Sequence, residues 1–372
     1  MRILIATVTA GGGHLAAAAA LDEAWRGLRP KDTVERVDLV KFFSPLHRKI
    51  HANGYVKLVE RAPELWGMIF AKTDNLKTAR RLNRIQGLIP SRARVRFAKY
   101  VSDFQPDVVL CTHFTPVTEV ADMRQKNLKQ QPLLVSVVTD FEAHALWMDA
   151  GVDLYCVAAE ETKARLIARG ATAESVVATG IPIATKFAAK VDALTVRKTL
   201  GLRDDLPTLL VLSGGFGMGP VGKILAALDK VPQEFQSVVV CGRNEDLRRE
   251  LAAQDRKHPT RVLGFAGNMH ELMGVADLII TKPGGLTSSE ALALGKPLFI
   301  LDPIPGQEAA NSDFLLERGA AVKVNRVEDL PFRVEQLLGS KKLGEMAKAA
   351  KTLGRMKSAV AVCEEVLRRV KA

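Results

Sequence analysis

The sequence predicts an α/β protein built around two doubly wound parallel sheets. Short apolar runs alternate with helical patterns along the chain, and this alternation restarts after about half of it. Each half carries a glycine-rich turn between an apolar strand and a helix: Gly11-Gly12-Gly13-His14 in the first half and Lys282-Pro283-Gly284-Gly285 in the second. With 372 residues the chain is long for one domain, so two domains are expected.

The expected strands are the apolar runs that turn residues bound on both sides. They cover residues 3–8, 34–39, 108–111, 133–139 and 154–158 in the first half, and 208–213, 237–241, 261–263, 278–281 and 298–301 in the second. The Gly180-Ile181-Pro182 turn closes the first half, which places the domain boundary at 189/190. The second domain is expected to span 190–355, and the amphipathic helix 356–372 to pack back on the first domain, 1–189.

Composition narrows the class of partner. The formal net charge of +12 favours acidic partners, namely nucleotide phosphates, an anionic membrane or nucleic acid. Zinc-finger spacings and RNA-binding sequence motifs are missing, so a nucleic-acid-binding protein is only a remote alternative. The four cysteines are widely scattered, which argues against a disulfide framework or a zinc ribbon and fits a reducing cytosol.

The N-terminal half contains a basic and aromatic stretch. Between Lys41 and Lys99, fourteen Lys and Arg residues stand against three acidic ones, and no apolar run reaches the about 18 residues that cross a bilayer. This composition predicts a peripheral protein on the cytoplasmic face of a membrane; the alternative is that the aromatic side chains pack inward and the cations are solvated. The expected membrane-contacting residues are Phe42, Phe43, Trp66, Phe70, Arg80, Arg81 and Arg84.

A second glycine-rich turn, Gly214-Gly215-Phe216-Gly217, follows the first strand of the second half. The Gly217 to Lys223 spacing imitates a phosphate-binding loop, but Ile224 replaces the Ser or Thr that would bind magnesium. The dinucleotide fingerprint also fails, because the next strand ends without a carboxylate for ribose. The turn is therefore expected to lie near a phosphate without belonging to either nucleotide-binding class.

Three motifs follow in order in the second half: Phe265-Ala266-Gly267-Asn268-Met269, Lys282-Pro283-Gly284-Gly285-Leu286-Thr287-Ser288-Ser289-Glu290 and Pro305-Gly306-Gln307-Glu308. This series resembles the C-terminal half of inverting GT-B glycosyltransferases that use UDP-sugars. Together with the turn ending at His14 and the segment from Thr139 to Trp147, the whole chain resembles the monogalactosyldiacylglycerol synthase and processive diacylglycerol glucosyltransferase group.

The resemblance implies a GT-B fold, with two Rossmann-like domains facing across a cleft, and transfer of galactose or glucose from a UDP-sugar to diacylglycerol. Phe265 and Met269 would flank the uracil, Glu290 would bind ribose, and Gln307 and Glu308 would bind the sugar hydroxyls. Backbone amides and the helix dipole would meet the diphosphate, so neither a metal nor another cofactor is expected. The expected donor-binding residues are Gly214, Gly215, Phe216, Gly217, Phe265, Met269, Lys282, Pro283, Gly284, Gly285, Leu286, Thr287, Glu290, Gln307 and Glu308.

Inverting transfer needs a base for the acceptor hydroxyl. His14 is the first candidate, because the N-terminus of a helix lowers the pKa of an imidazole and keeps it neutral. Asp140, which follows a strand, is the second candidate; it would act as the base itself or orient His14. The expected acceptor-side residues are Gly12, Gly13, His113, Phe141, His144 and Trp147.

Two other activities fit the same sequence plan. One is a UDP-GlcNAc transferase acting on a polyprenyl-linked peptidoglycan precursor, and the other, more remote, is a hydrolysing UDP-sugar epimerase. The Thr139-Asp140-Phe141 segment and the basic, aromatic stretch favour diacylglycerol. The choice between galactose and glucose, processivity and the oligomeric state stay open at this point.

Overall fold

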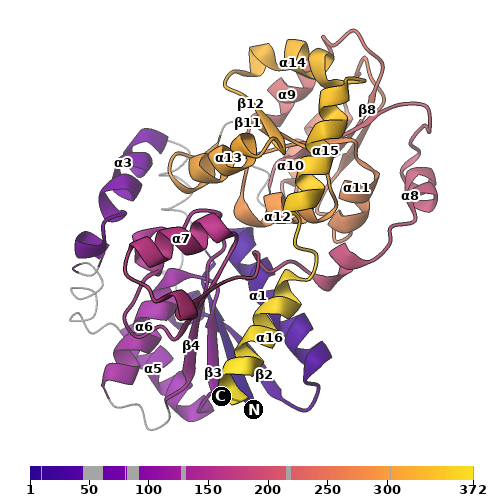
Figure 1. The fold of residues 1–372 in the computed structure, drawn as a ribbon. Helices are drawn as coiled ribbons and strands as arrows, with labels where there is room; N and C mark the ends of the chain where they lie inside the picture. The colour runs from indigo at the N-terminus through magenta and orange to yellow at the C-terminus, as the bar shows by residue number, and fades with distance from the viewer. Residues whose placement is uncertain are drawn as a thin grey trace. The chain divides into compact units, whose positions relative to one another are not determined.

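The computed structural model describes residues 1–9, 11–44, 62–79, 81, 92–126, 131–214, 219–301 and 303–371 (Figure 1). The chain divides into two compact units. Unit 1 contains Met1–Thr185, Ile304–Ala310 and Lys357–Ala372, and unit 2 contains Lys186–Pro303 and Asn311–Met356. The division after Thr185 lies a few residues before the expected boundary at 189/190, and the grouping of 304–310 with unit 1 had no signal in the sequence.

Unit 1 is built on a six-stranded parallel sheet with the strand order β2-β1-β3-β4-β5-β6. Its strands are β1 (Arg2–Thr7), β2 (Thr33–Asp38), β3 (Val108–Cys111), β4 (Leu133–Val137), β5 (Leu154–Val157) and β6 (Val176–Ala178). The central strands are buried along almost their whole length, as expected for a parallel sheet covered on both faces.

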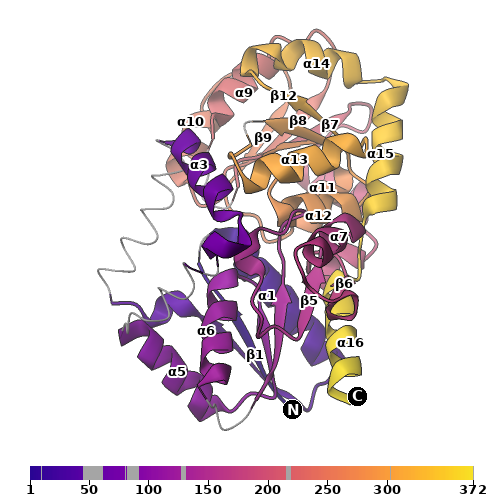
Figure 2. The same cartoon turned by 60° about the vertical axis from the view of Figure 1, so that its left-hand side comes forward.

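Helices cover both faces of this sheet. They are α1 (Gly12–Leu28), α5 (Arg92–Phe104), α6 (Phe114–Gln125), α7 (Glu160–Ala168) and α16 (Ser358–Lys371), whereas α3 (Pro63–Thr73) has no buried residue. The short 3-10 turns are η1 (Leu39–Phe42), η2 (Ala145–Trp147), η3 (Ala173–Ser175) and, at the boundary of the two units, η4 (Thr185–Ala188). Side chains of β1 alternate between two cores: Ile3 and Ile5 face α1 and α16, whereas Leu4 faces α5 and α6. The helix α16 therefore packs beside α1 in unit 1 (Figure 2).

Unit 2 repeats this plan with the strand order β12-β11-β10-β7-β8-β9, again all parallel. Its strands are β7 (Thr208–Leu212), β8 (Gln236–Val240), β9 (Thr260–Leu263), β10 (Leu278–Thr281), β11 (Leu298–Leu301) and β12 (Ala321–Val324). The edge strand β12 was not among the predicted strands, because Lys323 interrupts its short apolar run. The other predicted strands of both halves are present to within one or two residues at their ends.

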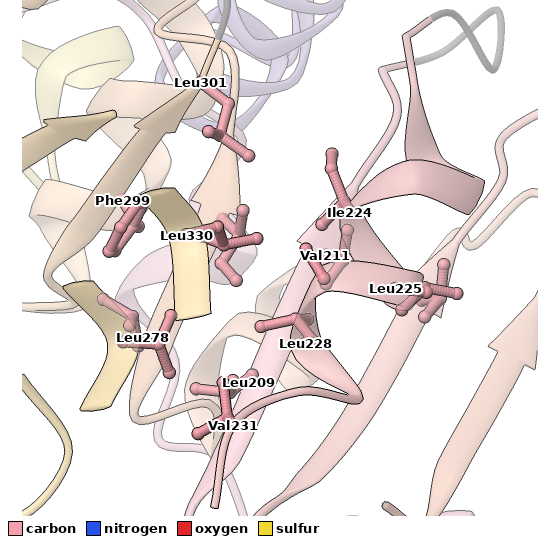
Figure 3. Close-up of a cluster of buried hydrophobic side chains, with 14 of the residues drawn as sticks. Leu209, Val211, Ile224, Leu225, Leu228, Val231, Leu278, Phe299, Leu301 and Leu330 are labelled. Carbon is pink, nitrogen blue, oxygen red and sulfur yellow. The ribbon is translucent and has the colours of Figure 1, made fainter. Parts of the chain in front are cut away.

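The helices of unit 2 are α8 (Ala193–Leu200), α9 (Val221–Leu228), α10 (Glu245–Ala252), α11 (Met269–Val275), α12 (Gly285–Ala293), α13 (Gln307–Glu317), α14 (Leu330–Leu337) and α15 (Lys341–Leu353), with the 3-10 turn η5 (Val327–Asp329). The first residues of α13 group with unit 1. Figure 3 shows Leu225 and Leu228 of α9 among the buried core side chains, which include Leu209 and Val211 of β7. This core fixes the strand ends from which the candidate site is built.

Two further observations concern sequence-based expectations. All four cysteines, at positions 111, 156, 241 and 363, are buried free thiols. Among the helices that the structure describes, none has both the length and the apolar character that crossing a membrane requires.

Candidate active site

His14 lies in the first turn of α1, directly beyond the carboxyl end of β1. The turn before it uses Gly11 at φ +125°, a backbone conformation that residues with a Cβ rarely adopt. Gly12 and Gly13 open the helix, and no side chain caps it. The glycine-rich turn therefore brings a half-buried imidazole to the carboxyl edge of the sheet.

One nitrogen of His14 is held by two oxygens. Nδ1 lies 2.8 Å from the main-chain oxygen of Thr112 and 3.0 Å from the hydroxyl oxygen of Thr139. A carbonyl oxygen only accepts hydrogen bonds, so the 2.8 Å contact requires the proton to be on Nδ1. The neutral ring then keeps its lone pair on Nε2, the atom that can take a proton from a substrate.

Burial lowers the pKa of His14 below its ordinary value. The negative charge of Asp140 and the hydrogen bond to the Thr112 carbonyl oppose this effect. Because burial has the larger influence, the imidazole is neutral at neutral pH and Nε2 is available as a base. Asp140 lies after β4, as expected, and its charge reaches His14; this places both predicted catalytic residues in one cluster of unit 1.

Aromatic rings surround His14. The His113 ring meets it edge-on with a centroid separation of 4.8 Å and stacks on Phe114 at 4.1 Å, while the Trp147 centroid lies 6.4 Å from that of His14. Nδ1 of His113 accepts a hydrogen bond from the Thr115 amide, 3.1 Å away, and so caps α6. His113 therefore lies beside the candidate base while also having a structural role.

His144 and Trp147 have structural contacts in unit 1, while their place on the acceptor side stays a prediction. Nδ1 of His144 accepts from the amide of Leu146, and Nε2 donates to the main-chain oxygen of Phe70, 2.9 Å away. Trp147 is only 3% exposed and packs with a buried cluster on β5 and α7; Phe141 is buried as well. With both nitrogens of His144 bonded, the segment from Phe141 to Trp147 presents structural side chains, and its polar atoms hold α3.

Asp74, at the end of α3, anchors that helix through an ionic cluster that sequence reasoning missed. Its carboxylate accepts two hydrogen bonds from Arg169, at 2.8 and 2.7 Å, one from Arg165 at 3.1 Å and one from the Ala145 amide at 2.8 Å. Burial alone would raise the pKa of Asp74, but these hydrogen bonds and the charge of Arg169 outweigh it and hold the pKa below its ordinary value.

The contacts and the exposure of the α3 side chains were not those expected from the sequence. Trp66 donates from Nε1 to Oε1 of Gln307, 3.3 Å away, and Phe70 lies against His144 and Gly306, all within unit 1. The exposed side chains are instead Leu65, Met68 and Ile69, which are 49%, 57% and 40% exposed. The aromatic side chains chosen from the sequence thus face the protein, and aliphatic side chains face away from it.

The remaining residues predicted to contact a membrane differ in burial. Phe42 is half-buried and packs against the core of unit 1, with the ring centroids of Phe97 and Tyr100 5.5 and 5.6 Å away. Phe43 is half-buried and Arg81 is exposed. Arg80 and Arg84 lie outside the described residues, as do Gly215, Phe216 and Gly217 of the predicted donor site.

The predicted donor-binding motifs of unit 2 follow neighbouring strands. Gly214 comes after β7, Phe265 after β9, and Lys282 and Pro283 after β10. Since β10, β7, β8 and β9 are adjacent and parallel, their carboxyl ends lie at one edge of the sheet, where α/β proteins bind ligands. The sheet therefore brings these motifs to one place.

Positive charge gathers at this edge. The helix α12 starts after Gly284 without a side-chain cap, so the amides of its first turn, which contains Gly285, Leu286 and Thr287, have no capping side chain. A Cβ on Gly219 would lie 3.8 Å from Cε of Lys282, so the lysine stem runs beside Gly219, just before α9. A helix N-terminus and an adjacent ammonium suit an anion such as a diphosphate.

Glu290 of α12 has a perturbed carboxyl group. Burial raises its pKa to about 8, and the charge of Lys186 acts in the opposite direction. Lys186 itself donates to the main-chain oxygen of Gly267, 2.6 Å away. Sequence reasoning missed Lys186 because nothing in the η4 segment signals contact with a turn more than eighty residues later.

Phe265 is the most exposed aromatic side chain of the described site, at 66%. The guanidinium carbon of Arg243 lies 5.5 Å from its ring centroid, a cation–π arrangement, and Met269 begins α11 beside it in sequence. An exposed ring next to a cation offers a flat platform for a planar base. Arg243, in the turn after β8, was not among the predicted donor residues.

Gln307 and Glu308 begin α13 in the segment that groups with unit 1. Gln307 accepts from Trp66, and Oε2 of Glu308 accepts from the Ile304 amide, 2.8 Å away. Among the described residues, no group of three or more His, Cys, Asp and Glu side chains is arranged to hold a metal ion.

Comparison with known protein families shows to which family the chain belongs. A family model described as monogalactosyldiacylglycerol (MGDG) synthase matches residues 14–183, and one described as glycosyltransferase family 28 C-terminal domain matches residues 211–364. The processive diacylglycerol beta-glucosyltransferase of Bacillus licheniformis is 32% identical over 368 residues, which covers 98% of this chain and 94% of the relative. The chain belongs to this glycosyltransferase family. The family resemblance predicted from the sequence is confirmed.

A second relative of the same name and two solved structures are also similar to this chain. The enzyme of the same name from Bacillus subtilis is 30% identical over 370 residues, covering 99% of this chain and 95% of the relative. Among solved structures, MurG of Acinetobacter baumannii has a TM-score of 0.61 at 16% identity, covering 99% of this chain and all of that one. UDP-GlcNAc 2-epimerase from Neisseria meningitidis has a TM-score of 0.63 at 14% identity, over 99% and 100%. These likenesses confirm the expected GT-B fold class.

The ionic cluster of Asp74 predicts a pH-dependent contribution to stability. In Asp74→Ala, Arg165 and Arg169 lose their shared partner, and we expect the free energy of unfolding near pH 7 to fall by about 1–3 kcal/mol, measured by urea denaturation. A carboxyl group with a lowered folded-state pKa stabilises above its unfolded pKa, and this stabilisation is lost as pH falls through the folded value. The difference from wild type should therefore narrow below about pH 4.

The matched control is Asp103→Ala, which removes an exposed carboxylate paired with Lys99 on α5. An exposed pair of this kind contributes about 1 kcal/mol or less. Equal losses for the two variants, or an Asp74→Ala deficit that is as large at pH 3 as at pH 7, would contradict the anchoring role.

Proposed function

We propose that this protein is an inverting glycosyltransferase that moves a hexose from a UDP-sugar to the hydroxyl of 1,2-diacylglycerol, giving a monoglycosyldiacylglycerol. The names of the relatives favour glucose, and that of the matching family model favours galactose as the second candidate. The observation that carries the proposal is the tautomer of His14, in which Thr112 holds the proton on Nδ1 and Nε2 remains basic. UDP and UDP-glucose are named with structures of Anabaena HepE that share the fold, which agrees with a nucleotide-sugar donor.

In the proposed donor site, Phe265 and Met269 hold the uracil and Glu290 accepts hydrogen bonds from the ribose hydroxyls. The diphosphate lies at the N-terminus of α12 with the Lys282 ammonium beside it, where positive potential stabilises the charge that develops on the leaving UDP. Gln307 and Glu308 contact the hexose. We propose that these groups suffice for departure of UDP without a bound metal.

The proposed chemical step is a direct displacement. Nε2 of His14 takes the proton of the acceptor hydroxyl as that oxygen forms a bond to the anomeric carbon. The bond from the anomeric carbon to the diphosphate oxygen breaks, and UDP leaves with the electron pair from the opposite side, which inverts the configuration. Asp140 stabilises the imidazolium that forms, since its charge favours the protonated ring.

The proposed membrane contact is the exposed face of α3. Leu65, Met68 and Ile69 project away from the protein, and Lys72 of the same helix and Arg81 beyond it are exposed cations. Aliphatic side chains flanked by cations suit the headgroup region of an anionic bilayer. The protein would then act from the surface of the membrane on its cytoplasmic face.

The first test is product formation from labelled UDP-glucose or UDP-galactose, each mixed with diacylglycerol in phosphatidylglycerol-containing vesicles in the presence of EDTA. We expect one glycosyl-diacylglycerol, with a further sugar added if transfer is processive. Product that forms only without EDTA would reject metal independence. No lipid product from either donor, together with transfer from UDP-GlcNAc to a polyprenyl-linked precursor, would replace the proposal by the peptidoglycan alternative.

The roles of His14 and Asp140 predict different variant behaviour. His14→Ala should lower kcat by roughly a hundredfold or more, with UDP binding unchanged. Asp140→Asn removes the influence that raises the His14 pKa, so the acid limb of the kcat/KM profile should move to lower pH while measurable activity remains. If Asp140→Asn abolishes activity at every pH and His14→Ala does not, the base is Asp140.

If the exposed aliphatic face of α3 contacts the membrane, substitutions on this face should weaken membrane binding. Met68→Ser with Ile69→Ser should weaken binding to phosphatidylglycerol vesicles at least several-fold in a flotation or tryptophan-fluorescence assay, because about 1.5–3 kcal/mol is lost for each aliphatic side chain that would be buried. Leu194→Ser, an exposed leucine at the start of α8 in unit 2, is the matched control. Equal vesicle binding by both variants and wild type would reject this surface.

A further inference from the structure

Two threonines that follow neighbouring strands meet at one atom of His14. Thr112 comes directly after β3 and Thr139 two residues after β4, and the parallel register of the two strands pairs Cys111 with Ser136. The oxygens lie 2.8 and 3.0 Å from Nδ1, and both threonine side chains are buried. Neither residue entered the prediction from the sequence as a functional group.

The Thr112 carbonyl is fixed in place by the residue's own contacts. Its amide donates to the Ala6 carbonyl at 3.1 Å, and its hydroxyl oxygen lies 2.9 Å from that of Thr7 and 3.0 Å from the main-chain oxygen of His14. These contacts join β1, β3 and the first turn of α1. Three elements of unit 1 therefore fix the position of the Thr112 carbonyl, which accepts the hydrogen bond from Nδ1 of His14.

We propose that Thr139 is a positioning residue for the reaction: its hydroxyl is the second acceptor for the Nδ1 proton of His14 and, with the Thr112 carbonyl, holds the ring so that Nε2 is the only basic nitrogen. This inference rests on the proposed role of His14 as the base. With one acceptor the N–H bond can swing away from that single contact, whereas two acceptors that follow neighbouring strands restrain its direction from two sides. The hydroxyl also favours the imidazolium that forms during transfer, since an acceptor binds a charged N–H more strongly than a neutral one.

The charged and titratable groups around His14 are few among the described residues. Asp140 acts from the segment after β4 and His113 from the segment after β3. Thr7 of β1 and Trp147 of η2 complete the surroundings without a charge near neutral pH. A change at Thr139 therefore acts on His14 against a background in which Asp140 is the one carboxylate whose charge is felt.

The experiment compares wild type, Thr139→Val and Thr139→Ser in the full-length protein. Long-range nitrogen–hydrogen NMR of ¹⁵N-histidine-labelled protein, with the His14 signals identified by their loss in His14→Ala, reports which ring nitrogen carries the proton and how it titrates. Wild type should show the proton on Nδ1. In Thr139→Val the His14 pKa should fall, and kcat should drop roughly three- to tenfold with KM for the UDP-sugar unchanged, as for loss of one hydrogen bond.

Thr139→Ser keeps the hydroxyl and should restore both the titration and kcat. A wild-type spectrum with the proton on Nε2 overturns the proposal, as does a Thr139→Val protein with an unchanged titration or a Thr139→Ser protein that behaves like it. If Thr139→Val does not fold, Thr139→Ala, which also removes the hydroxyl, takes its place in the same titration and kinetic measurements. An active His14→Ala enzyme would instead refute the proposed base, while the proton position in wild type would stand as measured.

Discussion

The parallel register of β1, β3 and β4 is the constraint on which the chemistry of unit 1 depends. Because the three strands run side by side in one direction, the residues that follow them, near Thr7, Thr112 and Thr139, end at one edge of the sheet. Thr112 and Thr139, which lie 98 and 125 residues after His14 in the chain, can then contact one imidazole. A slip of one residue in β3 would exchange the two faces of that strand and move the Thr112 carbonyl away from Nδ1. The apolar cores on both faces of the sheet therefore also fix the position of His14, the proposed base.

In both units a helix that begins after a glycine follows a strand at the carboxyl edge of the sheet. The helices α1 and α12 each follow a glycine, Gly11 and Gly284, and neither has a side chain that caps its first turn. In unit 1 the turn carries an imidazole, and in unit 2 the amides are accompanied by the Lys282 stem and a buried carboxyl, Glu290. The two glycines differ in backbone conformation, with φ +125° at Gly11 and −62° at Gly284. The proposed roles, proton transfer in unit 1 and anion and polyol binding in unit 2, therefore depend on the side chains beside each helix start.

The sequence predicted most of the strands and the residues that follow them, and physical reasons explain why the other strands and the long-range contacts were missed. Buried parallel strands are apolar throughout, so all but the shortest were found; the Lys323 strand at the edge of unit 2 was not, because an edge strand tolerates a charge. His14, Asp140 and the donor motifs follow strands directly and could be found from local order. The contacts of Thr139, Asp74 and Arg243 depend on which distant strands and helices become neighbours, which local patterns do not encode. The contacts of the α3 aromatic side chains could not be found from local patterns either, because Trp66 and its partner Gln307 lie 241 positions apart in the chain.

The helix α16 has a consequence for how the protein forms. Val362, Cys363 and Val366 are fully buried in the same core as Leu21 and Trp25 of α1, so Leu21 and Cys363, 342 positions apart in the chain, share one interior. Unit 1 cannot complete this core until residue 366 has left the ribosome, although all its strands were synthesised some two hundred residues earlier. Unit 2, whose segments end at Met356, is able to finish first. The core behind the segments that hold His14 thus becomes complete only after residue 366 has been synthesised, and a chain that stops before α16 leaves this core open.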